Sequence, residues 1–167
     1  MKIVLYPDLI LKQKAELIPI DSIRDYKVIV EEMHELLRST GIGLGLAGNQ
    51  VGIAKRVLVT NVEGPQTFIN PAIIEVSSEE GVCSEGCLSF PDVGGFIVRP
   101  TIIKISFIDL DGQSHIEVFN ETMARVLQHE IDHLDGLSLL DRMSKNEQRK
   151  NRKALKTLQL CKRLREG

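Results

Sequence analysis

The stretch Gln128-His129-Glu130-Ile131-Asp132-His133 decides the fold of this 167-residue chain. It lies within a run that repeats apolar residues at helical spacing: Met123, Leu127, Ile131 and Leu134. The run predicts a buried helix from about Glu121 to about Leu134, with Asn120 as its N-cap and Gly136 as its C′ residue. The opposite side should be polar and consists of Glu121, Arg125, Gln128, Asp132 and Asp135. The other elements are expected to pack around this helix.

Two histidines on that helix have the spacing of metal ligands. His129 and His133 are one turn apart and differ by about 40° in azimuth, so both imidazoles can reach one ion. Glu130 points beside such an ion, where a carboxylate can take a proton from water instead of acting as a ligand. The alternative is a solvated polar helix surface. The apolar flank argues against it, since burying two imidazoles and a carboxylate without partners costs several kcal/mol.

Cys87 is a candidate for a third ligand. It lies in Glu85-Gly86-Cys87-Leu88-Ser89-Phe90-Pro91, whose glycine and proline predict a turn beside the strands. A third protein ligand would leave one position of a tetrahedral site open, as a catalytic site needs. A buried apolar thiol is the usual role of a single cysteine, and Cys83 or a downstream carboxylate could supply the ligand instead. The residues alone leave these alternatives open.

Length and composition indicate one globular domain spanning residues 1–167. Apolar residues make up 43% of the chain and charged residues 26%. Charge is uneven, because residues 142–167 contain 10 Lys/Arg and 2 Asp/Glu, whereas residues 1–141 contain 11 and 21. Ser144 precedes a narrow apolar stripe that predicts one basic helix over about 145–165. Such a tail suits an anionic partner, although a solvated amphipathic helix has the same pattern.

The cysteines and the N-terminus indicate the compartment. Cys83, Cys87 and Cys161 are odd in number and lack the spacing of a disulfide framework, which favours a reducing environment. The first apolar run, residues 3–6, is interrupted by Pro7-Asp8 and is neither a secretory signal nor a membrane span. We therefore expect a cytoplasmic protein with no membrane partner.

The rest of the chain predicts an α+β fold, with antiparallel β-sheets packed around the central helix. A first helix should begin at the Ser22 cap and end at Gly41. The glycine-rich segment 41–52 is too loose for a helix and can cradle an extended ligand, and the Gln50 carboxamide near its end could donate to an oxyanion. Asp111-Gly112 predicts a hairpin. Strands are expected at 57–60, 68–70, 72–76, 102–109 and 115–119.

Three stretches occur in the order of a known set of motifs: Gly43-Leu44-Gly45-Leu46-Ala47-Gly48-Asn49-Gln50, Glu85-Gly86-Cys87-Leu88-Ser89 and Gln128-His129-Glu130-Ile131-Asp132-His133. Together they closely resemble the three signature motifs of bacterial peptide deformylases, and the likeness spans most of the chain. The resemblance implies a metal-dependent hydrolase that removes the N-formyl group from formylmethionine at the start of nascent proteins and releases formate. It also implies one divalent ion, Fe(II) in the cell, with Zn or Ni possible in a purified protein.

The resemblance also implies a role for each matching residue. The implied metal ligands are Cys87, His129 and His133. The implied catalytic groups are Glu130 as general acid and base, and Gln50 with the backbone N–H of Leu88 as the oxyanion site. The implied substrate-binding residues are Leu44 and Gly45 opposite Gly86, and a methionine pocket walled by Leu44, Val126 and His129.

Two residues depart from the family pattern. Gly48 stands where a second alanine usually follows Ala47, which could loosen the loop that holds Gln50. Gly94 stands where some members carry an arginine near the peptide-binding cleft. Arg99 matches a position at which the family commonly has arginine, and a structural role is expected for it.

Two other functions would use the same residues. A metallopeptidase shares the His-Glu-x-x-His chemistry, but the Glu-Gly-Cys-Leu-Ser segment argues against it. A small domain with a closed structural Cys/His metal site could bind nucleic acid through its tail, but Glu130 beside an open position argues otherwise. The resemblance instead implies formylmethionyl peptides and nascent chains as partners, docking on the ribosome through the basic C-terminal helix, and no specific DNA binding.

Overall fold

The computed structural model describes residues 1–166, the last two without their side chains. The 3₁₀ helices are η1 (Leu9–Lys12), η2 (Ile20–Tyr26) and η3 (Gly48–Val51). The α-helices are α1 (Lys27–Ser39), α2 (Glu121–Leu134), α3 (Leu139–Arg142), α4 (Lys145–Lys150) and α5 (Arg152–Glu166). The strands are β1 (Gly45–Ala47), β2 (Val57–Asn61), β3 (Pro65–Val76), β4 (Glu80–Gly86), β5 (Gly94–Pro100), β6 (Ile102–Ile108) and β7 (Ser114–Asn120).

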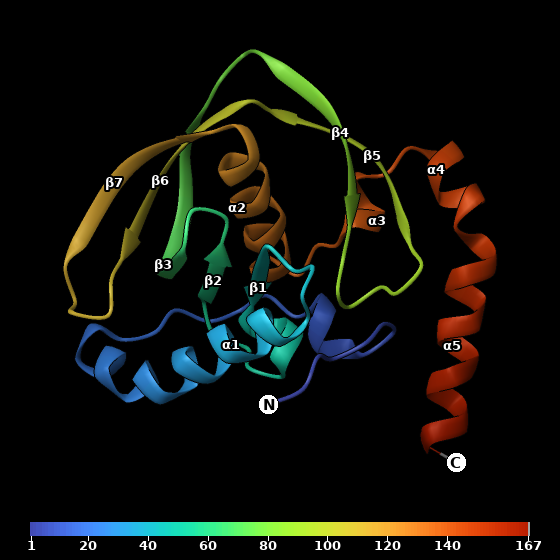
Figure 1. Ribbon diagram of the computed structural model, residues 1–167, viewed down its shortest axis with the longest axis horizontal. Coiled ribbons are helices and arrows are strands. Elements are labelled where there is room, and N and C mark those ends of the chain that lie inside the picture. Colours follow the sequence, from blue (N-terminus) through green and yellow to red (C-terminus); the bar gives the residue numbers. More distant parts are fainter. Residues whose placement is uncertain (167) are drawn as a thin grey trace.

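The strands form two antiparallel sheets. Five strands lie in the order β1-β2-β3-β6-β7, and β4 pairs with β5. Helix α2 lies between the larger sheet and the β4–β5 pair, while α1 lies at one end and α5 beyond β5 (Figure 1). This arrangement confirms the predicted α+β fold, with antiparallel sheets around a central helix, an N-terminal helix and a long C-terminal helix.

Helix α2 begins and ends where the sequence predicts. Asn120 is its extended N-cap residue, and Gly136, which follows the C-cap Asp135, has a φ of 75°. The apolar face of α2 packs on the larger sheet in one buried cluster, whose sheet members include Leu58 and Phe68. The helix is therefore anchored along its length, and the side chains that it presents have fixed positions.

Two residues on the predicted polar side of α2 are buried. Gln128 and Asp132 are each 6% exposed. Gln128 donates to the Pro100 carbonyl at 3.1 Å, and Asp132 accepts from Arg99 at 2.8 Å. The polar side is buried because α2 lies between two sheets, and β5 supplies its polar partners.

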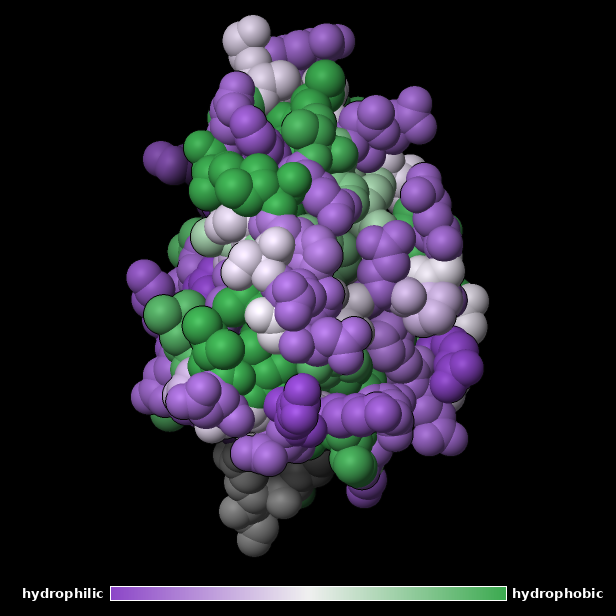
Figure 2. Space-filling view, turned by 90° about the vertical axis from the view of Figure 1, so that its left-hand side faces the viewer, coloured by the Kyte–Doolittle hydropathy of each residue, from purple (hydrophilic) through white to green (hydrophobic). Residues whose placement is uncertain are grey.

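Strand pairing confirms the predicted hairpin at Asp111-Gly112, which joins β6 to β7. β3 runs through Pro71 as one strand, where the sequence predicts two. The strand continues because its pairing with β6 bulges between Ile69 and Ala72, and Asn70 there takes a positive φ of 51°. β7 forms the edge of the larger sheet, and the view onto that side shows hydrophobic side chains interspersed with hydrophilic ones (Figure 2).

Several elements differ from the predicted ones. β4 and β5 were not among the expected strands, and the segment 41–52 contains β1 and η3. Residues 20–26 form a 3₁₀ helix, so α1 begins at Lys27, later than the predicted Ser22 cap. Short glycine-containing strands owe their conformation to partners that are distant in sequence, which a local pattern does not encode.

The C-terminal helix has an interruption that the sequence did not predict. The expected single helix over 145–165 consists of α4 and α5, separated by Asn151. Asn151 is 8% exposed, and its side-chain amide exchanges hydrogen bonds of 3.2 and 2.8 Å with the Gly94 backbone. These bonds fasten the tail to β5 and locally break the helix. Within residues 1–166, no helix combines the length and the apolar composition needed to cross a membrane.

Candidate metal centre

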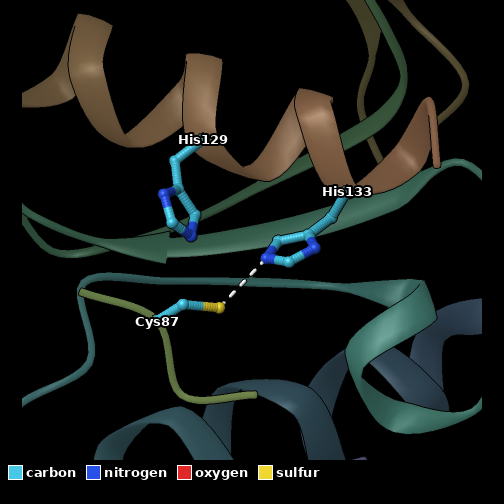
Figure 3. Close-up of side chains that lie close together, drawn as sticks. All are labelled: Cys87, His129 and His133. Carbon is cyan, nitrogen blue, oxygen red and sulfur yellow. Dashed lines mark hydrogen bonds between the residues drawn. The ribbon is translucent and has the colours of Figure 1, made fainter. Parts of the chain in front are cut away.

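Three side chains from two distant segments of the chain converge in the middle of the molecule. Cys87 directly follows β4, and His129 and His133 project from α2 toward it (Figure 3). One ligand atom from each residue lies within 4.8 Å of the other two, and Cys87 Sγ is 3.2 Å from His133 Nε2. Within the described part of the chain, this is the one Cys/His/acid group with such geometry. The structure thus brings together the three residues that the motifs single out.

Glu85, near the end of β4, contacts His129 from the side away from Cys87. Its Oε2 lies 3.0 Å from His129 Nδ1, which leaves Nε2 of that ring available to an ion. The carboxylate is buried, but Arg99 donates to it at 2.7 and 3.0 Å and Arg125 at 2.7 Å. Burial favours the neutral acid, yet the hydrogen bonds from His129 and both arginines outweigh it and hold the pKa of Glu85 well below its usual range. Glu85 is therefore an anion.

The two histidines respond differently to the same burial. For His129, burial opposes the charged form, but hydrogen bonds to Cys87 and Glu85 outweigh it and raise the pKa well above its usual value. For His133, burial and then the neighbouring charge on His129 lower the pKa well below its usual value. These contacts therefore favour a proton on His129, whereas His133 stays neutral with a lone pair to offer.

Glu130 lies beside the three residues and not among them. It is 4% exposed, and its Oε2 has no hydrogen-bond partner within the described residues. Burial raises the pKa of Glu130 to about 7. A Cβ on Gly45 would lie 2.6 Å from Glu130 Oε1 and 2.7 Å from Val126 Cγ1, so the β1 backbone passes directly against this carboxyl group. Only a glycine fits at that crossing.

Gln50, in η3, is held close to Cys87. It is 1% exposed, and its Oε1 accepts a hydrogen bond from the Ala47 N–H at 2.9 Å. This bond directs Nε2 toward Cys87 Sγ at 3.5 Å and Ser89 Oγ at 3.3 Å. The carboxamide that the sequence places at the end of the glycine-rich segment thus lies beside the candidate ligand.

The two glycines that depart from the family pattern are closely packed. A Cβ on Gly48 would lie 2.6 Å from the Lys55 carbonyl and 2.7 Å from the Ile53 carbonyl. A Cβ on Gly94 would lie 3.0 Å from the Glu85 carbonyl. Neither backbone position admits a larger residue without a shift, so both glycines are closely packed.

The residues that the sequence assigns to substrate binding line one cleft of about 1240 Å³. Leu44 and Gly45 come from the segment entering β1, the edge strand of the larger sheet, whereas Gly86 ends β4 and Val126 lies on α2. The same cleft is lined by the following predicted site residues: Gln50, Cys87, Leu88, His129 and Glu130. His133 does not line it, because it is fully buried behind them.

Comparison with known protein families matches residues 1–149 to the family described as polypeptide deformylase. The chain belongs to this family. The peptide deformylase of Chlorobium phaeobacteroides (strain BS1) is 39% identical over 161 residues, which covers 92% of this chain and 85% of the relative. That of Rhizobium meliloti (strain 1021) is 37% identical over 150 residues, covering 86% of this chain and 84% of the relative.

Solved deformylase structures share the fold. A Plasmodium falciparum peptide deformylase in complex with an inhibitor superposes with a TM-score of 0.87 at 38% identity, covering 94% of this chain and 98% of that one. The peptide deformylase from Thermotoga maritima gives 0.80 at 37% identity, with coverage of 86% and 97%. Deformylases are metal-dependent hydrolases that remove the N-formyl group from nascent peptides, and this is the activity of the chain. The metallopeptidase and structural-metal alternatives are thereby set aside.

The sequence did not reveal the polar network behind this deformylase centre. Arg99 has the structural role expected of it. It is 4% exposed, and its guanidinium donates to Glu85 at 2.7 Å and to Asp132 at 2.8 Å. Glu85, Asp132 and Arg125 had no assigned role. The sequence did contain a signal for two of them. Glu85 and Asp132 lie within the motifs, and carboxylates beside metal ligands commonly hydrogen-bond to those ligands and orient them.

Proposed function

We propose that this deformylase holds one divalent metal ion with Cys87, His129 and His133. The convergence of these three side chains is the observation that carries the proposal. The donors fit a transition-metal ion, because a thiolate and two imidazoles suit iron, zinc or nickel and not magnesium or calcium. Three protein ligands leave a position for water or substrate.

Fe(II) is the ion proposed for the cell, and Zn or Ni for protein purified in air. When bound, such an ion would supply Lewis-acid chemistry, polarising the formyl carbonyl and making water a better nucleophile. The hydrogen bond between Glu85 and His129 supports this assignment, because a carboxylate on Nδ1 fixes the ring orientation and raises the basicity of Nε2.

Glu130 is the proposed proton carrier. Its orphaned Oε2 and its pKa of about 7 support this role, since such a carboxyl group can both accept and release a proton near neutral pH. It would take a proton from the attacking water and return it to the departing amine. Its place beside the ligand group, and not within it, favours a carrier over a ligand.

Gln50 Nε2 and the Leu88 backbone N–H are the proposed donors to the oxyanion that forms on the formyl oxygen. The contacts of Nε2 with Cys87 and Ser89 are long, at 3.5 and 3.3 Å. Weak contacts of this kind can give way to a charged acceptor, which makes shorter and stronger hydrogen bonds. Burial of Gln50 holds the donor in place before the reaction.

The substrate is proposed to bind as an extended strand between Leu44-Gly45 and Gly86. β1 is an edge strand, so its free side can accept a further strand. The glycine at position 45 lets the backbone approach Glu130 closely. A formyl carbon carries only hydrogen, so a cramped site there excludes larger acyl groups. Leu44, Val126 and His129 are proposed to wall the methionine pocket.

We also propose that α5 docks on the ribosome in the bacterial cytoplasm. Arg152, Lys153 and Lys156 are exposed, and they support contact with phosphate groups. Two other basic residues of the tail are engaged within the chain, because Lys150 pairs with Glu147 and Lys162 with Asp8. The basic surface proposed for docking is therefore smaller than composition alone suggests.

Metal analysis of anaerobically purified protein, combined with a formate-release assay on a formyl-Met tripeptide, tests the function. We expect one Fe(II) per chain and one formate per peptide, with the peptide bonds left intact. A chelator should abolish the activity and Fe(II) should restore it. Cys87→Ala and His133→Ala should lose metal and activity together. Cleavage of the peptide bonds, or full activity without metal, would contradict the proposal.

A further inference from the structure

Arg125 lines the substrate cleft one helical turn before His129. Its Nη1 donates to Glu85 Oε1 at 2.7 Å and to the Ile97 carbonyl at 3.2 Å, and its Nη2 donates to the Gly81 carbonyl at 2.8 Å. These bonds fix the guanidinium against β4 and β5. The side chain remains 18% exposed.

The guanidinium of Arg125 has donors to spare. It carries five N–H groups, of which the three hydrogen bonds use three. Within the described residues, these hydrogen bonds come from Nη1 and Nη2 and none comes from Nε, which is not among the buried polar atoms without a partner. Arg125 therefore brings to the cleft lining an N–H donor that no residue of the described chain uses.

The surroundings of Arg125 give the cleft one polar wall. Cys83 and Thr122 also line the cleft. Cys83 lies midway between Gly81 and Glu85 on β4, both of which Arg125 contacts. Thr122 lies three residues before Arg125 on α2 and so on the same side of the helix. The apolar walls at Leu44 and Val126 are thus completed by side chains that carry heteroatoms.

We propose that Arg125 determines specificity by donating a hydrogen bond to the heteroatom of the first substrate side chain, which is the thioether sulfur of methionine. This inference rests on the proposed function, because it concerns the pocket for that side chain. Arg125 and His129 are about 6 Å apart along the helix axis, a span comparable with an extended methionine side chain. The sulfur is a weak acceptor, but it is the one polar atom that the side chain has.

A substrate with norleucine in place of methionine distinguishes a pocket that contains a hydrogen-bond donor from a purely apolar pocket. It has the shape of methionine with a methylene in place of sulfur, so an apolar pocket accepts it at least as well as methionine. A pocket with a fixed donor discriminates against it, because the donor is left unpaired. Methionine sulfoxide gives the complementary comparison, since its oxygen is a stronger acceptor than the thioether.

Replacing Arg125 leaves the metal centre supported. Glu85 keeps both hydrogen bonds from Arg99 and its contact with His129. Arg125→Met keeps an unbranched side chain and removes the donors. Arg142→Met is a matched control, because Arg142 also donates to a buried carboxylate, that of Asp132 at 3.0 Å, but does not line the cleft.

The test measures kcat/KM for three tripeptides that begin with formyl-Met, formyl-norleucine or formyl-Met sulfoxide, with metal content determined for each protein. The unaltered enzyme should prefer methionine over norleucine by about threefold to tenfold, the contribution of one hydrogen bond. It should accept the sulfoxide within about threefold of methionine. Arg125→Met should bring the methionine to norleucine ratio to about one and lower activity on the sulfoxide about tenfold.

The other variants complete the test. Arg125→Lys should restore part of the preference, because it retains a donor, and Arg142→Met should keep all three ratios. Equal ratios in the unaltered enzyme and Arg125→Met would overturn the inference while leaving the proposed function standing. Failure of the unaltered enzyme to release formate from any of the three peptides would instead overturn the proposed function.

Discussion

Glu85 Oε2 lies 3.0 Å from His129 Nδ1, so a carboxylate two residues before Cys87 holds a histidine of α2. One short segment of β4 therefore supplies a candidate ligand and also orients another. Arg99 and Arg125 hold the same carboxylate, from β5 and from α2. The centre is thus fixed by the docking of the β4–β5 pair on the helix, and not by the helix motif alone.

Glu85→Gln should weaken metal binding about 10- to 100-fold, because an amide keeps the shape of the side chain but removes the charge that orients and activates His129. The measurement is competition with a chelator of known affinity, followed by formate release at saturating metal. Glu75→Gln is the control, since Glu75 is an exposed residue of β3 whose carboxylate pairs with Lys104 at 3.5 Å, away from the metal centre. Equal metal affinity in the two variants would show that Glu85 does not contribute to metal binding.

Glu130→Gln should retain the metal and lose most turnover. The carboxyl group carries a proton and is not a ligand, and general acid-base groups typically contribute about 100- to 10,000-fold. Metal content and the rate of formate release, measured on the same sample, separate the two effects. Near-normal formate release by this variant would exclude Glu130 as the proton carrier.

Gly45→Ala should lower activity at least about tenfold, because small displacements of a catalytic group are costly. The added Cβ would lie 2.6 Å from Glu130 Oε1, so either β1 or the carboxyl group must move. Gly81→Ala is a matched control in β4, where a Cβ would meet its nearest atom, Thr101 Cγ2, at 3.3 Å. Comparable activity in both variants would mean that β1 can move away without consequence.

The sequence allowed the residues of the centre to be predicted, but not all of the strands and polar contacts that hold them. Motif spacing was sufficient for His129, His133 and Glu130, because helical geometry fixes their relative directions. Local patterns were not sufficient to predict β4 and β5. Their residues resemble those of loops, and the two segments become strands by pairing with each other. The partners of Glu85 are 14 to 44 residues away in sequence, so no local pattern reveals that a buried anion lies there.

The iron-loaded protein should lose activity in air, through oxidation of Fe(II) or of the Cys87 thiolate. The zinc-loaded or nickel-loaded protein should be more durable, because those ions do not undergo the same oxidation. The measurement is formate release over hours of aeration, with anaerobic samples of each metal form as controls. Full activity of the aerated iron form would mean that Fe(II) is not the working ion or that Cys87 is shielded from oxidation.

Neutralising the exposed basic residues of α5 should weaken ribosome binding and leave the chemistry intact. The triple variant Arg152→Gln, Lys153→Gln and Lys156→Gln keeps the packing of Leu158 and Asn151, which truncation would remove. Each lost phosphate contact should reduce the salt slope of binding by about 0.7 to 0.9. Sedimentation with purified ribosomes across a salt series measures this slope, and Lys12→Gln with Lys14→Gln controls for charge alone. Hydrolysis of a short formyl-Met peptide should be unchanged, because these residues lie outside the cleft. Equal, salt-insensitive binding by all three proteins would mean that α5 is a solvated helix without a ribosomal role.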